Sequence, residues 1–219
     1  MFFDDAITVS RELELTLTGK DCGQAERAPM CGVPHHAAEI YISKLIAKGY
    51  KVAICEQLED PKTAKGIVKR GVIRVVTPGT VIESNMLEEK KNNYIMSIVK
   101  KGIYYGIAVC DVTTGDFYST EIKENNNFPL VLDEIARYSP AELVVNSMMY
   151  DSKEEIGKIK ERFEIYFTRF NDKFFSEDIN TIVENYNLVD NDDNHIKDID
   201  KRLFSVASIN ALVEYLKQT

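Results

Sequence analysis

The spacing of apolar residues predicts a helix and then a strand at the start of the chain. Apolar side chains recur at helical intervals from Ala6 to Leu13 and then alternate with polar ones up to Gly19. Residues 19–36 show neither period and contain three glycines and two prolines, which is typical of a long loop. Long loops inside compact domains often carry function.

Helical and strand-like patterns continue to alternate up to residue 76. Apolar positions over 37–48 predict a helix, and strands are expected over 50–55 and 72–76. Between these strands, Asp60-Pro61 is typical of a helix start, and Gly66 keeps that helix short. Alternation of helix and strand predicts a small mixed α/β domain.

Three strand-like segments open the second half of the chain, joined by short connections that contain glycine. They cover residues 94–99, 104–112 and 117–122, so we expect an antiparallel meander. The later patterns predict a helix that ends before Ser139, a strand over 143–145, a helix around 156–163 and a final helix from about Ser205. Residues 171–202 are rich in Asn and Asp and hold a candidate helix capped at Ser176. The expected fold of this half is a mixed sheet flanked by helices.

A change in composition separates the two halves. Residues 77–80 form a turn signal, and residues 83–93 are polar or charged except for two apolar side chains. We therefore expect a first domain over residues 1–82, a linker over 83–92 and a second domain over 93–219.

The composition is that of a soluble globular protein and excludes fibrous and integral membrane classes. Hydrophobic residues make up 44% of the chain and charged residues 28%. The apolar run Met1–Phe3 is far shorter than the core of a secretory signal. The four cysteines form no CxxC pair, so we expect reduced thiols and a cytoplasmic location.

The distribution of charge changes what the total suggests about partners. A net charge of -8 speaks against a polyanion, but residues 1–82 carry +1 and residues 83–219 carry -9. Between residues 61 and 82 the chain has no acidic residue and five basic ones, which are Lys62, Lys65, Lys69, Arg70 and Arg74. This window, extended by Lys20 and Arg27, predicts a surface for DNA phosphates. A solvated face without a partner has the same composition.

An apolar tip occupies the predicted loop at residues 28–32. An exposed Pro29 and Met30 would form a wedge that enters a minor groove. A Met30 folded under the loop would belong to the core instead. Residue types by themselves leave both interpretations open.

Residues of metal-binding or catalytic type occur in patterns that match no common site. The first group is Cys22, Cys31, His35 and His36, whose spacing fits no usual zinc motif. Asp111 and Asp116 are the carboxylates that a metal-dependent nuclease would need, but aspartates beside a turn are mostly structural. No phosphate-binding loop, zincin or serine hydrolase motif is present. We therefore expect no catalysis, cofactor or metal in this chain.

Four blocks of the first half resemble the mismatch-binding domain of the bacterial MutS family. They are MFFDDA (1–6), APMCGVPHHA (28–37), AICEQLEDP (53–61) and RVVTPGT (74–80). The second half resembles the connector domain of that family through NNYIMSIV (92–99), YYGIAVCDVTTGDFY (104–118), SPAEL (139–143) and VEYLKQT (213–219). The resemblance implies a ribonuclease H-like fold for the connector. It also implies a role in DNA mismatch repair, in which the family binds mismatches and small unpaired loops in duplex DNA.

The resemblance also limits what this chain is expected to do alone. The Phe-x-Glu motif with which the family reads a mismatch would directly precede Met1, and the ATPase domain that uses ATP and Mg²⁺ would follow the connector. The implied partners are mismatched duplex DNA, downstream mismatch repair proteins, the remaining MutS domains and a second MutS subunit, with no membrane. We expect weak, poorly mismatch-selective DNA binding through Lys20, Pro29, Met30, Lys65, Lys69, Arg70 and Arg74. The alternative is a protein interaction module with negligible DNA binding by itself.

Overall fold

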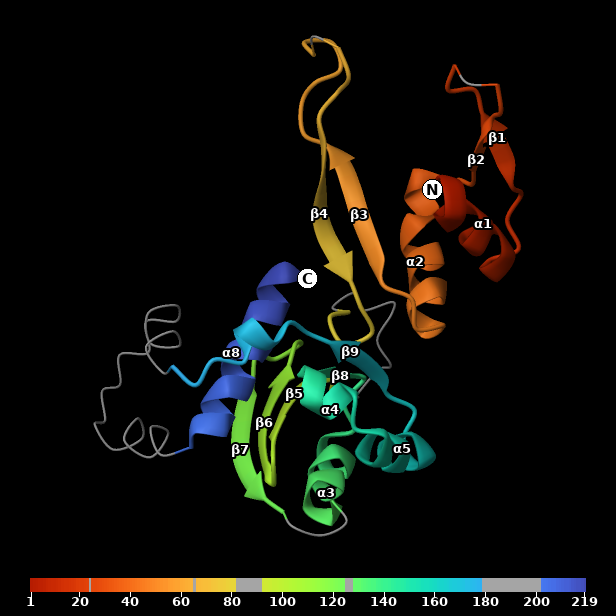
Figure 1. Ribbon diagram of the computed structural model, residues 1–219. Coiled ribbons are helices and arrows are strands. Elements are labelled where there is room, and N and C mark those ends of the chain that lie inside the picture. The colour runs from red at the N-terminus through yellow and green to blue at the C-terminus, as the bar shows by residue number, and fades with distance from the viewer. Residues whose placement is uncertain (24, 65, 82–91, 125–127, 179–201) are drawn as a thin grey trace. The chain divides into compact units, whose positions relative to one another are not determined.

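The chain divides into two compact units, Met1–Thr77 and Pro78–Thr219. The computed structural model describes residues 1–23, 25–64, 66–81, 92–124, 128–178 and 202–219 (Figure 1). Among the helices in these ranges, none is long and apolar enough to cross a membrane. The predicted linker over 83–92 lies outside the described residues except for Asn92.

The first unit combines two main helices with two separate antiparallel strand pairs. Its elements are α1 (Phe3–Glu12), β1 (Thr18–Lys20), β2 (Ala28–Met30), the 3-10 helix η1 (His35–Ala37), α2 (Ala38–Ala47), β3 (Val52–Gln57) and β4 (Arg70–Val76). β1 pairs with β2, and β3 pairs with β4. The mixed α/β class predicted for this half is confirmed.

Residues at the ends of the two main helices explain where they begin and end. Asp4 and Asp5 lie in the first turn of α1 and Arg11 in its last turn, where each charge interacts favourably with the helix dipole. α2 is followed by Gly49, which takes a φ of 83° that glycine adopts without a steric penalty. The helix expected over 37–48 is confirmed.

Two predictions for the region before η1 are wrong. The strand expected over the alternating leucines up to Gly19 is absent before Thr18, where β1 begins, and at Glu14 a φ of 54° is incompatible with an extended strand. The loop expected over 19–36 contains β2, so Pro29 and Met30 lie in a paired strand. The alternating leucines were a misleading signal because pairing, more than local periodicity, decides where a short strand forms.

The short helix expected after Asp60 is also wrong, since the chain makes only a turn there. Asp60 Oδ1 accepts a hydrogen bond from the N–H of Lys62 at 2.9 Å, and its carbonyl accepts from Thr63 and Ala64 at 3.0 and 3.1 Å. The capping chemistry that the sequence indicates is therefore present. It closes one turn in the connection between β3 and β4 and goes no further.

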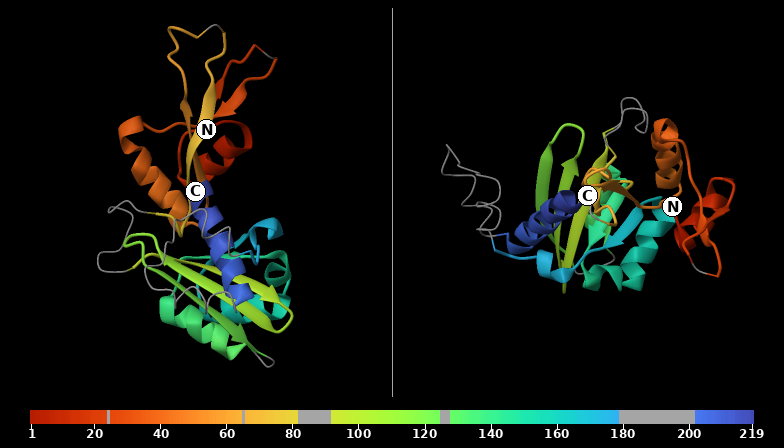
Figure 2. Two further views of the ribbon diagram at one scale, coloured as in Figure 1. Left: turned by 90° about the vertical axis from the view of Figure 1, so that its left-hand side faces the viewer. Right: turned by 90° about the horizontal axis from the view of Figure 1, so that it is seen from above.

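The second unit is built on one five-stranded mixed sheet with helices on both faces (Figures 1 and 2). In chain order its elements are β5 (Tyr94–Lys101), β6 (Tyr104–Asp111), β7 (Phe117–Lys123), α3 (Pro129–Tyr138), β8 (Glu142–Val145), α4 (Ser147–Tyr150), α5 (Lys153–Arg162), β9 (Tyr166–Arg169), the 3-10 helix η2 (Asp172–Phe174) and α8 (Leu203–Gln218). The strand order is β7-β6-β5-β8-β9, with an antiparallel meander on one side of β5 and two strands parallel to it on the other. The ribonuclease H-like fold class is thereby confirmed.

Alternate residues of the central strands supply two separate cores. Ile107 and Val109 of β6 pack in the cluster that includes residues of α3 and α5, whereas Ala108 and Cys110 pack in the cluster of α8. This two-fold period is the expected consequence of a strand covered on both faces. β6 is consequently apolar almost throughout.

Most of the elements predicted for this half are present. The meander, the helix before Ser139, the strand over 143–145 and the last two predicted helices are confirmed as β5–β7, α3, β8, α5 and α8. The sequence did not indicate α4 or β9, which are only four residues long each. The candidate helix capped at Ser176 falls largely on residues 179–201, outside the described residues.

Candidate nucleic-acid interface

The first two residues of the chain lie against β2. The amino group of Met1 donates to the carbonyl of Cys31 at 2.8 Å, and the N–H of Cys31 donates to the carbonyl of Met1 at 3.1 Å. Phe2 forms an antiparallel bridge with Met30. Met30 is therefore held between β1 and the start of the chain, and its side chain is half-buried.

Lys20 and Met30 share one face of the β1–β2 hairpin. Thr18 lies opposite Met30 and Lys20 lies opposite Ala28, so both side chains fall on the same side of the pair. Lys20 Nζ lies 5.8 Å from the centre of the Phe2 ring. Pro29 falls on the other face, where it is opposite Gly19. A cation, an aromatic ring and a flexible thioether thus form one small surface.

The second hairpin places Arg70 and Arg74 on opposite faces. Arg70 lies opposite Gln57 and Arg74 opposite Ile54, and the register shifts between Ile54 and Cys55. Arg70 is exposed, whereas Arg74 is half-buried. The basic window in the sequence does not distinguish the two arginines, but in the structure only Arg70 is on the exposed face.

Exposed basic residues gather towards the far end of the β3–β4 hairpin. Lys62 and Lys69 in the connection are exposed, as is Arg70 at the start of β4. Ile67 lies in the same connection and is 99% exposed. Lys65, which the sequence also indicates, lies outside the described residues.

Pairing of β3 with β4 also brings acidic residues next to the basic window. Glu59 Oε1 accepts a hydrogen bond from the N–H of Lys69 at 2.6 Å, and Glu56 lies opposite Gly71. Residues 52–76 contain five basic and three acidic side chains, a net charge of +2. The electrostatic attraction for phosphate is therefore weaker than the acid-free window by itself suggests.

The free ends of the two hairpins extend in the same direction from the first unit (Figures 1 and 2). Lys20 and Met30 belong to one hairpin and Lys69 and Arg70 to the other, so four of the predicted residues lie on two parallel projections. Sequence reasoning missed Phe2 and Ile67 as neighbours of these cations. The available signal was a short apolar run at each position, Met1–Phe3 and Ile67–Val68.

The sequence also offers residues for a zinc site and for a metal-dependent nuclease, and the structure shows how they are arranged. Within the described ranges, no group of three or more His, Cys, Asp or Glu side chains is arranged to hold a metal ion. Asp111 is buried, and its Oδ1 accepts from the hydroxyl and the N–H of Thr113 at 2.6 and 2.9 Å. Burial acts to raise the pKa of Asp111, but these hydrogen bonds outweigh it and lower the pKa below its ordinary value. Asp111 thus stabilises the turn before β7.

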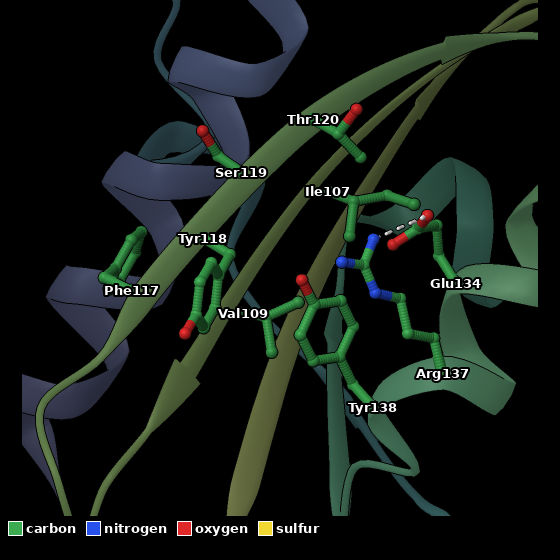
Figure 3. Close-up of a pocket in the computed structure, with 9 residues that line it drawn as sticks. All are labelled: Ile107, Val109, Phe117, Tyr118, Ser119, Thr120, Glu134, Arg137 and Tyr138. Atoms are coloured by element: carbon green, nitrogen blue, oxygen red, sulfur yellow. Dashed lines mark ion pairs between the residues drawn. The ribbon is translucent and has the colours of Figure 1, made fainter.

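The second unit presents a groove of about 450 Å³ between the edge strand β7 and helix α3 (Figure 3). Ile107 and Val109 line it, with Tyr118 of β7 on one side and Tyr138 of α3 on the other. The centres of the two tyrosine rings are 5.6 Å apart, so the rings are in contact, and Tyr118 is 46% exposed. A half-exposed aromatic side chain beside an edge strand is a common feature of protein interaction surfaces.

Two sequence family models match the chain, one in each half. MutS domain I matches residues 1–85, and MutS domain II matches residues 93–219. The DNA mismatch repair protein MutS of Acetivibrio thermocellus is 54% identical over 223 residues, which cover 100% of this chain and 25% of that protein. The protein of the same name from Ruminiclostridium cellulolyticum is 51% identical over the same shares of both chains. The chain spans about a quarter of the length of these curated relatives.

Among solved structures, the catalytic core domain of HTLV-2 integrase in complex with magnesium is similar to part of this chain. The match has a TM-score of 0.27 and 11% sequence identity, and it covers 53% of this chain and 86% of that one. A similarity of this size supports no conclusion about the fold or the chemistry of the chain.

Proposed function

Because the chain belongs to the MutS family of DNA mismatch repair proteins, we propose that its first unit binds duplex DNA weakly and with little mismatch selectivity of its own. The observation that carries this proposal is the placement of exposed cations on two hairpins that extend the same way (Figure 1). Lys69 and Arg70 are on one hairpin and Lys20 is on the other.

The two hairpins are proposed to make different kinds of contact. Lys69 and Arg70 would neutralise phosphates, an interaction that does not depend on base sequence. Met30 with Phe2 would lie against the apolar edge of the minor groove, because a thioether and an aromatic ring suit a surface of sugars and base edges. Phosphate contacts would supply most of the affinity, so weak selectivity is expected.

A salt-dependent titration tests this proposal. Fluorescence anisotropy with a duplex of about 30 base pairs, fully paired or carrying one mismatch, should show binding at low salt that falls steeply as salt rises. Lys69→Glu combined with Arg70→Glu should weaken binding to both duplexes equally and should lower the slope of log K against log salt by about 0.9 for each lost phosphate contact. Met30→Ala should weaken binding while leaving that slope unchanged.

Lys153→Glu combined with Arg162→Glu on the exposed surface of α5 provides the matched control, since it also reverses two charges but in the second unit. It should change the affinity little. Absence of any binding at low salt would refute the proposal, and so would unchanged binding by the Lys69 and Arg70 double variant.

The groove between β7 and α3 favours a second candidate function, that of an interaction module with negligible DNA contact. Its proposed occupant is an extended segment of a partner repair protein, which would pair with the edge strand β7 and place an apolar side chain in the groove against the rings of Tyr118 and Tyr138. Capture of such a partner that is lost with Tyr118→Ser and kept with Tyr150→Ser, an equally exposed tyrosine elsewhere, would support this function. Capture that survives Tyr118→Ser would exclude the groove.

We also propose that the chain by itself is not an enzyme and needs no cofactor. The two matched family models describe MutS domains I and II, and the described residues present no cluster suited to a metal. ATP and Mg²⁺ are assigned by this proposal to the ATPase domain of the parent family.

A further inference from the structure

The four residues that follow the first unit are packed into the second unit. The chain passes from one unit to the other between Thr77 and Pro78. Pro78, Gly79 and Val81 are all buried, whereas a free linker would be solvated. The chain is therefore packed against the second unit almost from the first residue after Thr77.

Glu142, at the start of β8, is the centre of this packing. Its side chain is completely buried, and its Oε2 accepts a hydrogen bond from the N–H of Gly79 at 3.1 Å. Its Oε1 accepts from the hydroxyl of Tyr215 in α8 at 2.7 Å and from the hydroxyl of Thr168 in β9. Burying a carboxylate is costly unless hydrogen-bond donors surround it. The three donors to Glu142 come from different segments, so the folded second unit fixes their positions around the carboxylate.

A second hydrogen bond holds the other end of the same segment. Asn93 Nδ2 donates to the carbonyl of Val81 at 2.9 Å, and Asn93 itself is buried at the start of β5. Val81 and Asn93 thus lie together on the second unit, although twelve positions separate them in the sequence. The segment is therefore held to the second unit at Gly79 and again at Val81.

No side chain would fit at position 79 without displacing its neighbours. A Cβ at this position would lie 2.8 Å from Glu142 Cβ and 3.0 Å from Ile95 Cδ1. The backbone of residue 79 therefore lies directly on β5 and β8, and an alanine there would push the segment off the sheet.

We propose that Glu142 is the anchor that fixes the point at which the first unit is attached to the second. On this proposal the units are joined by the short segment 77–81, and the polar residues 83–92 are not what separates them. A free chain of the roughly 15 residues from Thr77 to Asn92 would have a root-mean-square span of roughly 20 Å. A segment anchored at Gly79 instead attaches the first unit to the second at a single point. This inference does not depend on whether the first unit binds DNA.

Distance measurements within the 219-residue chain test the anchor. Spin labels on Cys55, which is exposed in β3, and on Glu161→Cys in α5 report the distribution of distances between the units. Cys22→Ser removes the other exposed thiol, and Cys31 and Cys110 are buried. Glu142→Ala and Gly79→Ala should each broaden the distribution, because each detaches residue 79 by a different route.

Hydrogen exchange shows whether the bond to Gly79 has been lost in each variant. The Gly79 amide should exchange about tenfold faster or more in Glu142→Ala, as expected for loss of a hydrogen bond to a charged acceptor, while the Val144 amide in β8 should remain protected. Glu142→Gln should restore slow exchange and a narrow distribution. Its amide oxygen can accept from Gly79 while its NH₂ donates to the hydroxyls of Tyr215 and Thr168.

Two controls separate anchoring from general destabilisation. Tyr215→Phe removes a donor from the other carboxylate oxygen and should lower the stability of the second unit without broadening the distribution. Ten Gly and Ser residues inserted after Glu88 should likewise leave the distribution unchanged. An insertion that broadens it as much as Glu142→Ala would overturn the proposal, as would an unchanged width in both Glu142→Ala and Gly79→Ala.

Discussion

Helix α8 passes very close to the sheet at Gly106 of β6. A Cβ on Gly106 would lie 1.8 Å from the carbonyl oxygen of Phe204 and 2.8 Å from the nitrogen of Ser205. A glycine inside an apolar strand indicates either a bulge or the close approach of another backbone. At Gly106 the structure shows a close approach, and the approaching segment is the first turn of α8.

Replacing Gly106 with alanine should therefore lower the stability of the second unit. Because the obstacle is backbone and cannot rotate away, α8 must shift, at an expected cost of about 1–3 kcal/mol. Urea unfolding followed by far-ultraviolet circular dichroism measures this change. Gly157→Ala is the control, since no atom lies within 4 Å of a Cβ there and the change should raise the stability of α5 by about 0.5–1 kcal/mol. A Gly106→Ala variant as stable as the wild type would contradict the close approach.

At the scale of elements, an ion pair joins strand β5 to the start of helix α5. Lys100 Nζ forms a salt bridge with Glu155 and donates to the hydroxyl of Ser152 at 2.7 Å. The side chains of Lys100 and Glu155 are only 16% and 15% exposed. Burial acts to raise the pKa of Glu155, but hydrogen bonds from Lys100 and Ser152 outweigh it and hold the pKa at about 2, against an ordinary value of 4.5.

Because of this lowered pKa, the stability of the second unit depends on pH in the acidic range. A carboxyl whose pKa is lower in the folded state stabilises the fold above pH 4.5, and the contribution disappears as the pH falls from about 4.5 to about 2. Glu155→Gln should therefore cost up to about 3 kcal/mol at pH 7 and much less at pH 2.5. Urea unfolding at both pH values tests this expectation. Glu154→Gln, on the exposed side of the same helix, should cost little at either pH, and an equal loss at both pH values for Glu155→Gln would disprove the assignment.

The elements themselves were predictable where one face of a long segment is buried. The apolar period of α3 and the continuous apolar run of β6 gave the right structures, because burial of one helix face and of both strand faces is what stabilises them. The short strands β1 and β2 were not predictable from such a period, because Met30 depends on Thr18 and on Phe2 for its hydrogen bonds and bridge. Those partners lie 12 and 28 positions away in the sequence.

At the scale of the whole molecule, the two units differ in the size of their cores. Six buried apolar side chains are described for the first unit, half of them small, and they are Ala6, Ala28, Cys31, Leu45, Ile46 and Val76. The second unit has two clusters, one on each face of its sheet. Apolar burial dominates folding stability, so the first unit should be the less stable of the two.

Differential scanning calorimetry should therefore show two transitions for the chain. The first unit should unfold at the lower temperature, and a fragment of residues 78–219 should retain the upper transition with little change. Leu45→Ala should shift the lower transition, and Ile107→Ala should shift the upper one, each by lowering stability about 2–5 kcal/mol. A single transition that both substitutions shift together would contradict independent units.

The candidate interface shows how far sequence reasoning reaches. Residue types alone indicated Lys20, Met30, Lys69 and Arg70, because local charge and an apolar tip are visible in one dimension. Pairing of β3 with β4 then placed Arg74 on the other face of its hairpin and brought Glu59 beside Lys69. Contact across a hairpin depends on register, which the composition of a window does not specify.

The sequence by itself determined the fold class, the main helices and strands and the family resemblance, because periodicity and motif order are properties of neighbouring positions. Tertiary structure alone decided which cations share a face, what lies against Gly106 and that Glu142 holds Gly79. The distinction has a physical reason. Residue 79 and residue 142 are brought together only when β5, β8 and α8 pack, and the energy of a buried carboxylate depends on donors that chain folding supplies from distant parts of the sequence.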